Sequence, residues 1–149
     1  MALVRAVRRI EAPVELVWDR VTDWQAHGRW IPLTVVSIDQ DSPATRGLGT
    51  KFTGRTALGP LGFDDLMTVT EWQPPHDGAG GRCRIEHRGR WVGGWAEILV
   101  EPDGAATRLS WIEDVQPRWT PRFVDAAVSR VGTVLFGGTL RKLAAELEG

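Results

Sequence analysis

The sequence predicts an α+β fold in which seven antiparallel strands form a curved sheet and one long C-terminal helix lies across its concave face. Three observations support this prediction. A strand-like segment is followed by a proline and a helical pattern, six more strand-like segments are joined by short turns, and helical periodicity runs for more than 25 residues after Thr120. A helix that long in a small β-rich chain must bury its apolar stripe against the sheet.

The N-terminal elements are predicted to be one strand and two short helices. Segment 3–11 mixes apolar and basic residues in imperfect alternation and is interpreted as the first strand. Pro13 suits the first turn of a helix, and the apolar residues that follow recur at helical spacing as far as Asp23. Residues 24–30 are predicted to form a second short helix.

The middle of the chain predicts an antiparallel meander, because its strand-like segments are separated by short, polar, Gly- and Pro-containing turns. A long helix then follows, for which Thr120 is a candidate N-cap and Pro121 suits the first helical position. The six strands of the meander are expected at residues 34–39, 50–58, 63–72, 82–91, 94–101 and 107–116.

Length and charge restrict the possible functions. The chain has 149 residues, which fits one domain spanning 1–149. Its 18 Lys and Arg nearly balance 19 Asp and Glu, so no overall electrostatic field favours nucleic acid as a partner. The arginines that alternate along 82–90 are expected on the outer face of the sheet, paired with carboxylates of neighbouring strands.

The remaining composition favours a soluble cytoplasmic protein. The single cysteine, Cys83, excludes an internal disulfide, and we expect neither a signal peptide nor stable membrane insertion. Eight tryptophans and no tyrosine can supply an aromatic cavity wall but no phenol for proton transfer. No metal-binding or nucleotide-binding spacing is present, so no metal and no cofactor is expected.

The segment Ile10-x-Ala12-Pro13-x-x-x-Val17-Trp18, with the Asp-Trp pair at 23–24 and Trp30, resembles the N-terminal signature of the START-like (SRPBCC) superfamily. The resemblance is to its polyketide cyclase/dehydrase-like branch and covers essentially the whole chain. It implies the helix-grip fold, known from Bet v 1-like proteins, in which the sheet and the long helix enclose a cavity for a small, mostly apolar molecule. The matching residues look structural, so they do not identify the ligand or a reaction.

Two polar residues are candidates for chemistry in such a cavity. His87 shares a strand face with Cys83 and Ile85, and Glu113 shares one with Trp111. His87 is either a proton shuttle or a structural histidine bonded to the backbone. Glu113 is either a polar anchor or general base in the cavity, or an exposed residue near a strand end or an ion-pair partner. His27 and His76 lie in loop-like sequence and are expected to be exposed.

The candidate ligand-binding residues are chosen for aromatic or apolar character on strands or on the long helix, with one arginine to orient a polar group. They are Phe52, Arg55, Met67, Ile85, Trp91, Trp95, Leu109, Trp111, Phe123, Ala127, Val131 and Leu135.

The leading functional hypothesis is a binding protein for a lipid, a polyketide or a related hydrophobic metabolite. The alternative is an enzyme of the aromatase/cyclase kind, in which His87 or Glu113 removes a proton alpha to a carbonyl and Arg55 or a water steadies the enolate. A small regulatory protein that acts on a partner also stays open, as does a homodimer.

Overall fold

The computed structural model describes residues 2–149. Strands make up most of the chain, with short helices after the first strand and a long helix at the C-terminus. The elements are β1 (Ala2–Ile10), α1 (Val14–Val21), the 3-10 helix η1 (Trp24–Ala26), α2 (His27–Trp30), β2 (Thr34–Ile38), β3 (Lys51–Leu58), β4 (Leu61–Gln73), β5 (Gly81–Arg88), β6 (Val92–Asp103), β7 (Ala106–Pro117), the 3-10 helix η2 (Arg122–Val124) and α3 (Asp125–Glu148).

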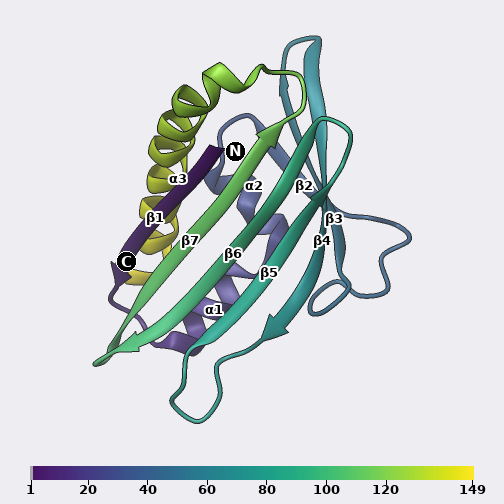
Figure 1. The fold of residues 1–149 in the computed structure, drawn as a ribbon. Helices are drawn as coiled ribbons and strands as arrows, with labels where there is room; N and C mark the ends of the chain where they lie inside the picture. The colour runs from purple at the N-terminus through teal and green to yellow at the C-terminus, as the bar shows by residue number, and fades with distance from the viewer. Residues whose placement is uncertain (1) are drawn as a thin grey trace.

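The strands form one seven-stranded sheet in the order β1-β7-β6-β5-β4-β3-β2, with every neighbouring pair antiparallel. The first strand, β1, is therefore an edge strand and pairs with the last strand, β7. The helices after β1 lie on the concave side of the curled sheet (Figure 1). The predicted fold class, a curved seven-stranded antiparallel sheet with two short helices and a long C-terminal helix, is confirmed.

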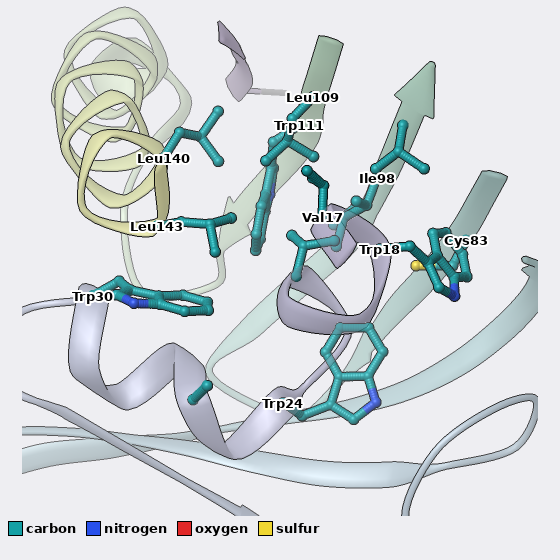
Figure 2. Packing of buried hydrophobic residues seen from close by; sticks show 14 of the residues in the cluster. Val17, Trp18, Trp24, Trp30, Cys83, Ile98, Leu109, Trp111, Leu140 and Leu143 are labelled. Atoms are coloured by element: carbon teal, nitrogen blue, oxygen red, sulfur yellow. The ribbon is translucent and has the colours of Figure 1, made fainter. Parts of the chain in front are cut away.

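The core fills one end of the concave side, where α1, η1, α2 and the C-terminal half of α3 meet the sheet. Trp24 and Trp30 are almost fully buried there, and Leu140 and Leu143 of α3 belong to the same cluster, with Leu143 pointing toward Trp30 (Figure 2). Each buried side chain of this size stabilises the fold by about 1.5–3 kcal/mol. Because these side chains fill only one end of the concave side, the other end contains a cavity.

Helix α3 begins later than predicted. Its first helical residue is Asp125, after the 3-10 helix η2, and the Thr120 hydroxyl donates to the Pro117 carbonyl instead of capping a helix. By length and apolar composition alone, residues 122–148 could cross a bilayer, although no membrane-spanning segment was expected from the sequence. In the fold, however, this helix packs on β1, where a Cβ at Gly132 would lie 2.6 Å from Val4.

The convex face of the sheet carries the arginines of β5, as predicted. Arg82 pairs with Glu71 on β4 and, at 2.9 Å, with Glu97 on β6, and Arg84 lies 3.0 Å from the same Glu97. These side chains are satisfied by carboxylates of neighbouring strands. The opposite, concave face of β5 is thereby assigned to Cys83, Ile85 and His87, all of which are buried.

Candidate functional site

A cavity of about 670 Å³ lies between the concave face of the sheet and the N-terminal half of α3. That volume is within the range of small-molecule sites, about 300–1,000 Å³. Most of its wall is apolar. The apolar and small lining residues include Ile31, Pro32, Leu33 and Val36 from the α2–β2 region, Phe52, Gly54, Phe63, Met67, Ile85, Val92, Ala96, Trp111, Val115 and Pro117 from the sheet, and Ala127, Val128, Val131, Gly132, Leu135 and Phe136 from α3.

A group of three polar residues, the polar triad of Asp65, His87 and Glu113, interrupts this apolar wall. Nδ1 of His87 donates a hydrogen bond to Oδ1 of Asp65 at 2.8 Å. Nε2 of His87 lies 3.7 Å from Oε1 of Glu113, too far for a hydrogen bond. The side chains of His87 and Glu113 are 3% and 9% exposed and that of Asp65 is 21% exposed, so His87 and Glu113 are shielded from solvent and Asp65 is partly accessible.

The register of the sheet brings the triad together. Asp65 comes from β4, His87 from β5 and Glu113 from β7, and each occupies an inward-facing position of its strand. His87 pairs with Met67 on one side and with Gly94 on the other. Because Gly94 has no side chain, no β6 side chain packs beside the His87 ring at this paired position.

The two carboxylates favour the charged form of His87. Burial alone would lower the pKa of His87, but the hydrogen bond that its ring donates to Asp65 and the nearby Glu113 outweigh burial and raise this pKa to about 10. Burial raises the pKa of Asp65, and the hydrogen bond to His87 offsets part of that rise. The raised pKa favours an imidazole that carries a proton on both nitrogens at neutral pH, and in that form the ring donates hydrogen bonds and does not accept a proton.

Glu113 is fixed by the indole beside it. Nε1 of Trp111 donates to Oε1 of Glu113 at 3.3 Å, and the Trp111 ring lies 5.1 Å from that of Phe136 on α3. Trp111 thus forms part of the apolar wall and holds the carboxylate at the same time.

His27, which we expected to be exposed, is only 4% exposed and lines the cavity. The prediction was wrong because η1 and α2 turn this segment onto the sheet, where a loop-like sequence becomes core. Nε2 of His27 donates to the Val21 carbonyl at 2.7 Å, and burial lowers the pKa of His27. His27 is accordingly a neutral imidazole.

Nine of the fourteen sequence-predicted site residues line the cavity. In the structure, strand alternation or helical periodicity places them on the inward side. They are Phe52, Met67, Ile85, His87, Trp111, Glu113, Ala127, Val131 and Leu135.

The other five lie elsewhere. Arg55 is three residues from Phe52, so it points to the opposite face of β3, where it pairs with Asp64 at 3.3 Å. Trp95 lies on the convex face of β6, with the Arg84 guanidinium over its ring. Leu109 faces inward but belongs to the solid core at the other end of the sheet.

Trp91 and Phe123 fall outside regular strands and helices that face the cavity. Trp91 is in the turn before β6 and is 42% exposed, while Phe123 is in η2 and is 85% exposed. Both were chosen for their aromatic character, which carries no information about direction.

Asp65 is the residue that sequence reasoning missed. A signal for it exists, because Phe63, Asp65, Met67 and Val69 alternate along β4 and place one carboxylate on an otherwise apolar face. The proximity of Asp65 to its partner, His87, follows from the pairing of β4 with β5, which the sequence does not specify. Within residues 2–149, no group of three or more His, Cys, Asp or Glu is arranged to hold a metal ion.

Comparison with known proteins relates this architecture to a family. The family model described as "Polyketide cyclase / dehydrase and lipid transport" matches residues 1–148. A search of the curated proteins gave no match.

Solved structures share the fold at low sequence identity. A crystal structure of a Thermus thermophilus protein has a TM-score of 0.77 and 18% identity, covering 97% of this chain and 96% of that one. A START superfamily protein from Mycobacterium smegmatis has a TM-score of 0.62 and 18% identity, with 100% and 96% covered. The Aha1 dimer from Colwellia psychrerythraea has a TM-score of 0.65 and 17% identity, with 99% and 97% covered.

Proposed function

The chain belongs to the polyketide cyclase/dehydrase and lipid transport family, and we propose that it binds one small hydrophobic molecule in the cavity between the sheet and α3. The observation that carries this proposal is the wall itself: a space of about 670 Å³ bounded mostly by apolar side chains, with a few polar groups gathered at one place. Burial of apolar ligand surface supplies about 25 cal/mol per Å² toward binding.

Within this proposal, the walls and the triad have different roles. Phe52, Met67, Ile85 and Trp111 from the sheet, and Ala127, Val131 and Leu135 from α3, provide the apolar contact. His87 and Glu113 set the orientation, because a ligand that leaves buried polar groups unpaired binds less well than one that pairs them.

Native mass spectrometry of the purified protein tests the proposal directly. We expect a population with one bound small molecule of low polarity, or, after delipidation, a one-to-one adduct with members of a hydrophobic panel. Quenching or a shift of indole fluorescence should accompany binding, because Trp111 lines the cavity. No adduct and no fluorescence response across the panel would contradict the proposal.

A second candidate function is proton abstraction from a carbon alpha to a carbonyl. It is favoured by the buried Glu113 carboxylate beside a protonated imidazole. Glu113 would take the proton, the electron pair of the C–H bond would pass into the enolate, and Nε2 of His87 would donate a hydrogen bond to the enolate oxygen. His87 thus replaces Arg55, which lies on the other face of the sheet, as the group that steadies this oxygen.

Turnover of a poly-β-ketone tests this candidate. Glu113→Gln and His87→Ala should each lower the rate by at least about 100-fold, the usual contribution of one acid–base group. Asp64→Asn, on the opposite face, is the matched control and should leave the rate unchanged. Full turnover by Glu113→Gln would remove the carboxylate from the mechanism.

A cytoplasmic location and a homodimeric assembly are also proposed. The free, buried Cys83 fits a reducing cytoplasm. A homodimer has a precedent in the Colwellia protein that shares the fold, and sedimentation analysis would determine whether this chain forms one.

A further inference from the structure

We propose that the cavity selects its ligand by charge: it accepts an apolar molecule whose polar end is a neutral carbonyl or hydroxyl group, and it rejects the carboxylate of the same chain length. This inference rests on the proposed binding function and names the ligand class of the same cavity. It follows from three features of the wall: its titratable groups, the one donor without a partner, and the absence of a compensating cation.

The titratable side chains of the wall are two carboxylates and two imidazoles. Asp65 comes from β4, His87 from β5, Glu113 from β7 and His27 from the α2 segment. The lining part of α3 contributes only apolar residues and Gly132, and β2 and β3 contribute no charged group. Among residues 2–149, no Lys or Arg lines the cavity.

One donor of the wall is unused. Nε2 of His87 is buried and has no hydrogen-bond partner among residues 2–149, whereas Nδ1 of the same ring is bonded to Asp65. A buried donor without an acceptor is costly, and a ligand oxygen that accepts from it removes that cost. The wall therefore offers a hydrogen bond to an acceptor at the polar end of the ligand.

The balance of charge then separates neutral acceptors from anions. The single imidazolium of His87 faces two carboxylates, Asp65 at 2.8 Å and Glu113 at 3.7 Å, so its charge is already more than matched. His27 does not add a second cation, because it is buried and its Nε2 donates to the backbone. A ligand carboxylate would be a third anion in a desolvated site, which costs binding free energy. A ketone or an alcohol makes the same hydrogen bond without that charge.

Three probes of equal length test the inference: undecanone, undecanol and undecanoate, each titrated into the delipidated protein at pH 7.5 and followed by indole fluorescence and calorimetry. We expect the ketone and the alcohol to bind at least about tenfold more tightly than the carboxylate. Undecane serves as the apolar reference. Equal or tighter binding of undecanoate would overturn charge selection and leave the binding function standing.

Binding by none of the four compounds would overturn both the binding function and this inference, so the two failures are distinguishable. A variant provides a second, independent measurement. Glu113→Gln removes one negative charge while keeping a side-chain oxygen for Trp111, and it should reduce the ketone-to-carboxylate preference at least about fivefold. Glu86→Gln, on the convex face of β5, should leave the preference unchanged. An unchanged preference in Glu113→Gln would overturn the assignment of selectivity to this carboxylate.

Discussion

His87 is the residue whose chemical state matters most for the cavity. Burial lowers its pKa, but Asp65 and Glu113 outweigh burial and raise the pKa to about 10. We therefore expect NMR titration of the imidazole to show a protonated His87 through pH 8, and a clearly lower pKa in Asp65→Asn. Because the folded-state pKa lies above the ordinary value of 6.5, this group stabilises the fold fully below about pH 6.5, and the contribution is lost as pH rises toward 10.

His27 provides an internal control in the same spectrum. Burial lowers its pKa, so its imidazole should remain neutral at pH values where His87 is charged. A His87 that titrates at or below its ordinary value, or one that does not respond to Asp65→Asn, would contradict the charge state on which the selectivity of the cavity depends.

Gly94 occupies a position at which any side chain would be strained. Its φ is +105°, and a Cβ would lie 1.8 Å from the Asp114 carbonyl oxygen on β7. We expect Gly94→Ala to lower the free energy of unfolding by about 3 kcal/mol, which combines backbone strain with a clash. Gly104→Ala, at φ +63° with nothing within 4 Å, has strain alone and should cost about 1 kcal/mol. Chemical denaturation of both variants measures the difference, and equal losses would contradict the clash.

At the scale of the elements, Glu146 joins the C-terminal end of α3 to the short helices. Its carboxylate accepts hydrogen bonds from Arg29 at 3.0 Å, from Nε1 of Trp30 at 2.9 Å and from Arg20 at 2.9 Å. The bond from Arg29 is the largest of several causes that lower the pKa of Glu146 to about 2. One side chain therefore connects α1, α2 and α3.

Removal of this charge should loosen the helices. Because the Glu146 side chain is 30% exposed, solvent screening limits the expected loss in Glu146→Gln to about 1 kcal/mol, measured by denaturation at pH 7. The folded-state pKa is depressed, so the stabilisation is present above about pH 4.5 and is lost as pH falls toward 2. Glu101→Gln on β6 is the control. Parallel pH profiles for Glu146→Gln and the parent protein would contradict the proposed contribution.

At the scale of helices and strands, the sequence predicts the order of the elements and some of their inward-facing residues, but not the register of the strands. Turn chemistry and periodicity predicted the order of helices and strands, and alternation assigned Ile85, His87, Trp111 and Glu113 to the inward face. Arg55 was chosen for its charge without that test, and it points outward. Register was the missing information for Asp65, because its proximity to His87 depends on the pairing of β4 with β5.

At the scale of the molecule, the fold could be predicted from the sequence, but the position of the cavity within the fold could not. The same inward-facing pattern continues from Leu109 to Trp111 and Glu113, yet Leu109 is solid core while the other two line the cavity. The difference arises because α1 and the C-terminal half of α3 pack against only one end of the concave side. No local pattern in the sequence encodes the boundary between this packed end and the cavity.

Helix α3 offers a matched pair of variants that tests the use of the cavity. Ala127 and its neighbour Ala126 are both exposed, but only Ala127 lines the cavity. A tryptophan at position 127 should occupy part of the space, so Ala127→Trp should weaken binding of undecanone at least about tenfold. Ala126→Trp should bind like the parent protein. Equal affinities for the two variants would place the binding site elsewhere.

The central claim is that an apolar molecule is buried in this cavity, and the heat-capacity change of binding tests it most directly. Burial of apolar surface makes this change negative, whereas contact at an exposed surface leaves it near zero. Calorimetric titration of undecanone at several temperatures from about 10 °C to about 35 °C should give one site per chain and a clearly negative heat-capacity change that Ala127→Trp diminishes. Saturable binding with no heat-capacity change, or no binding at any temperature, would contradict the account.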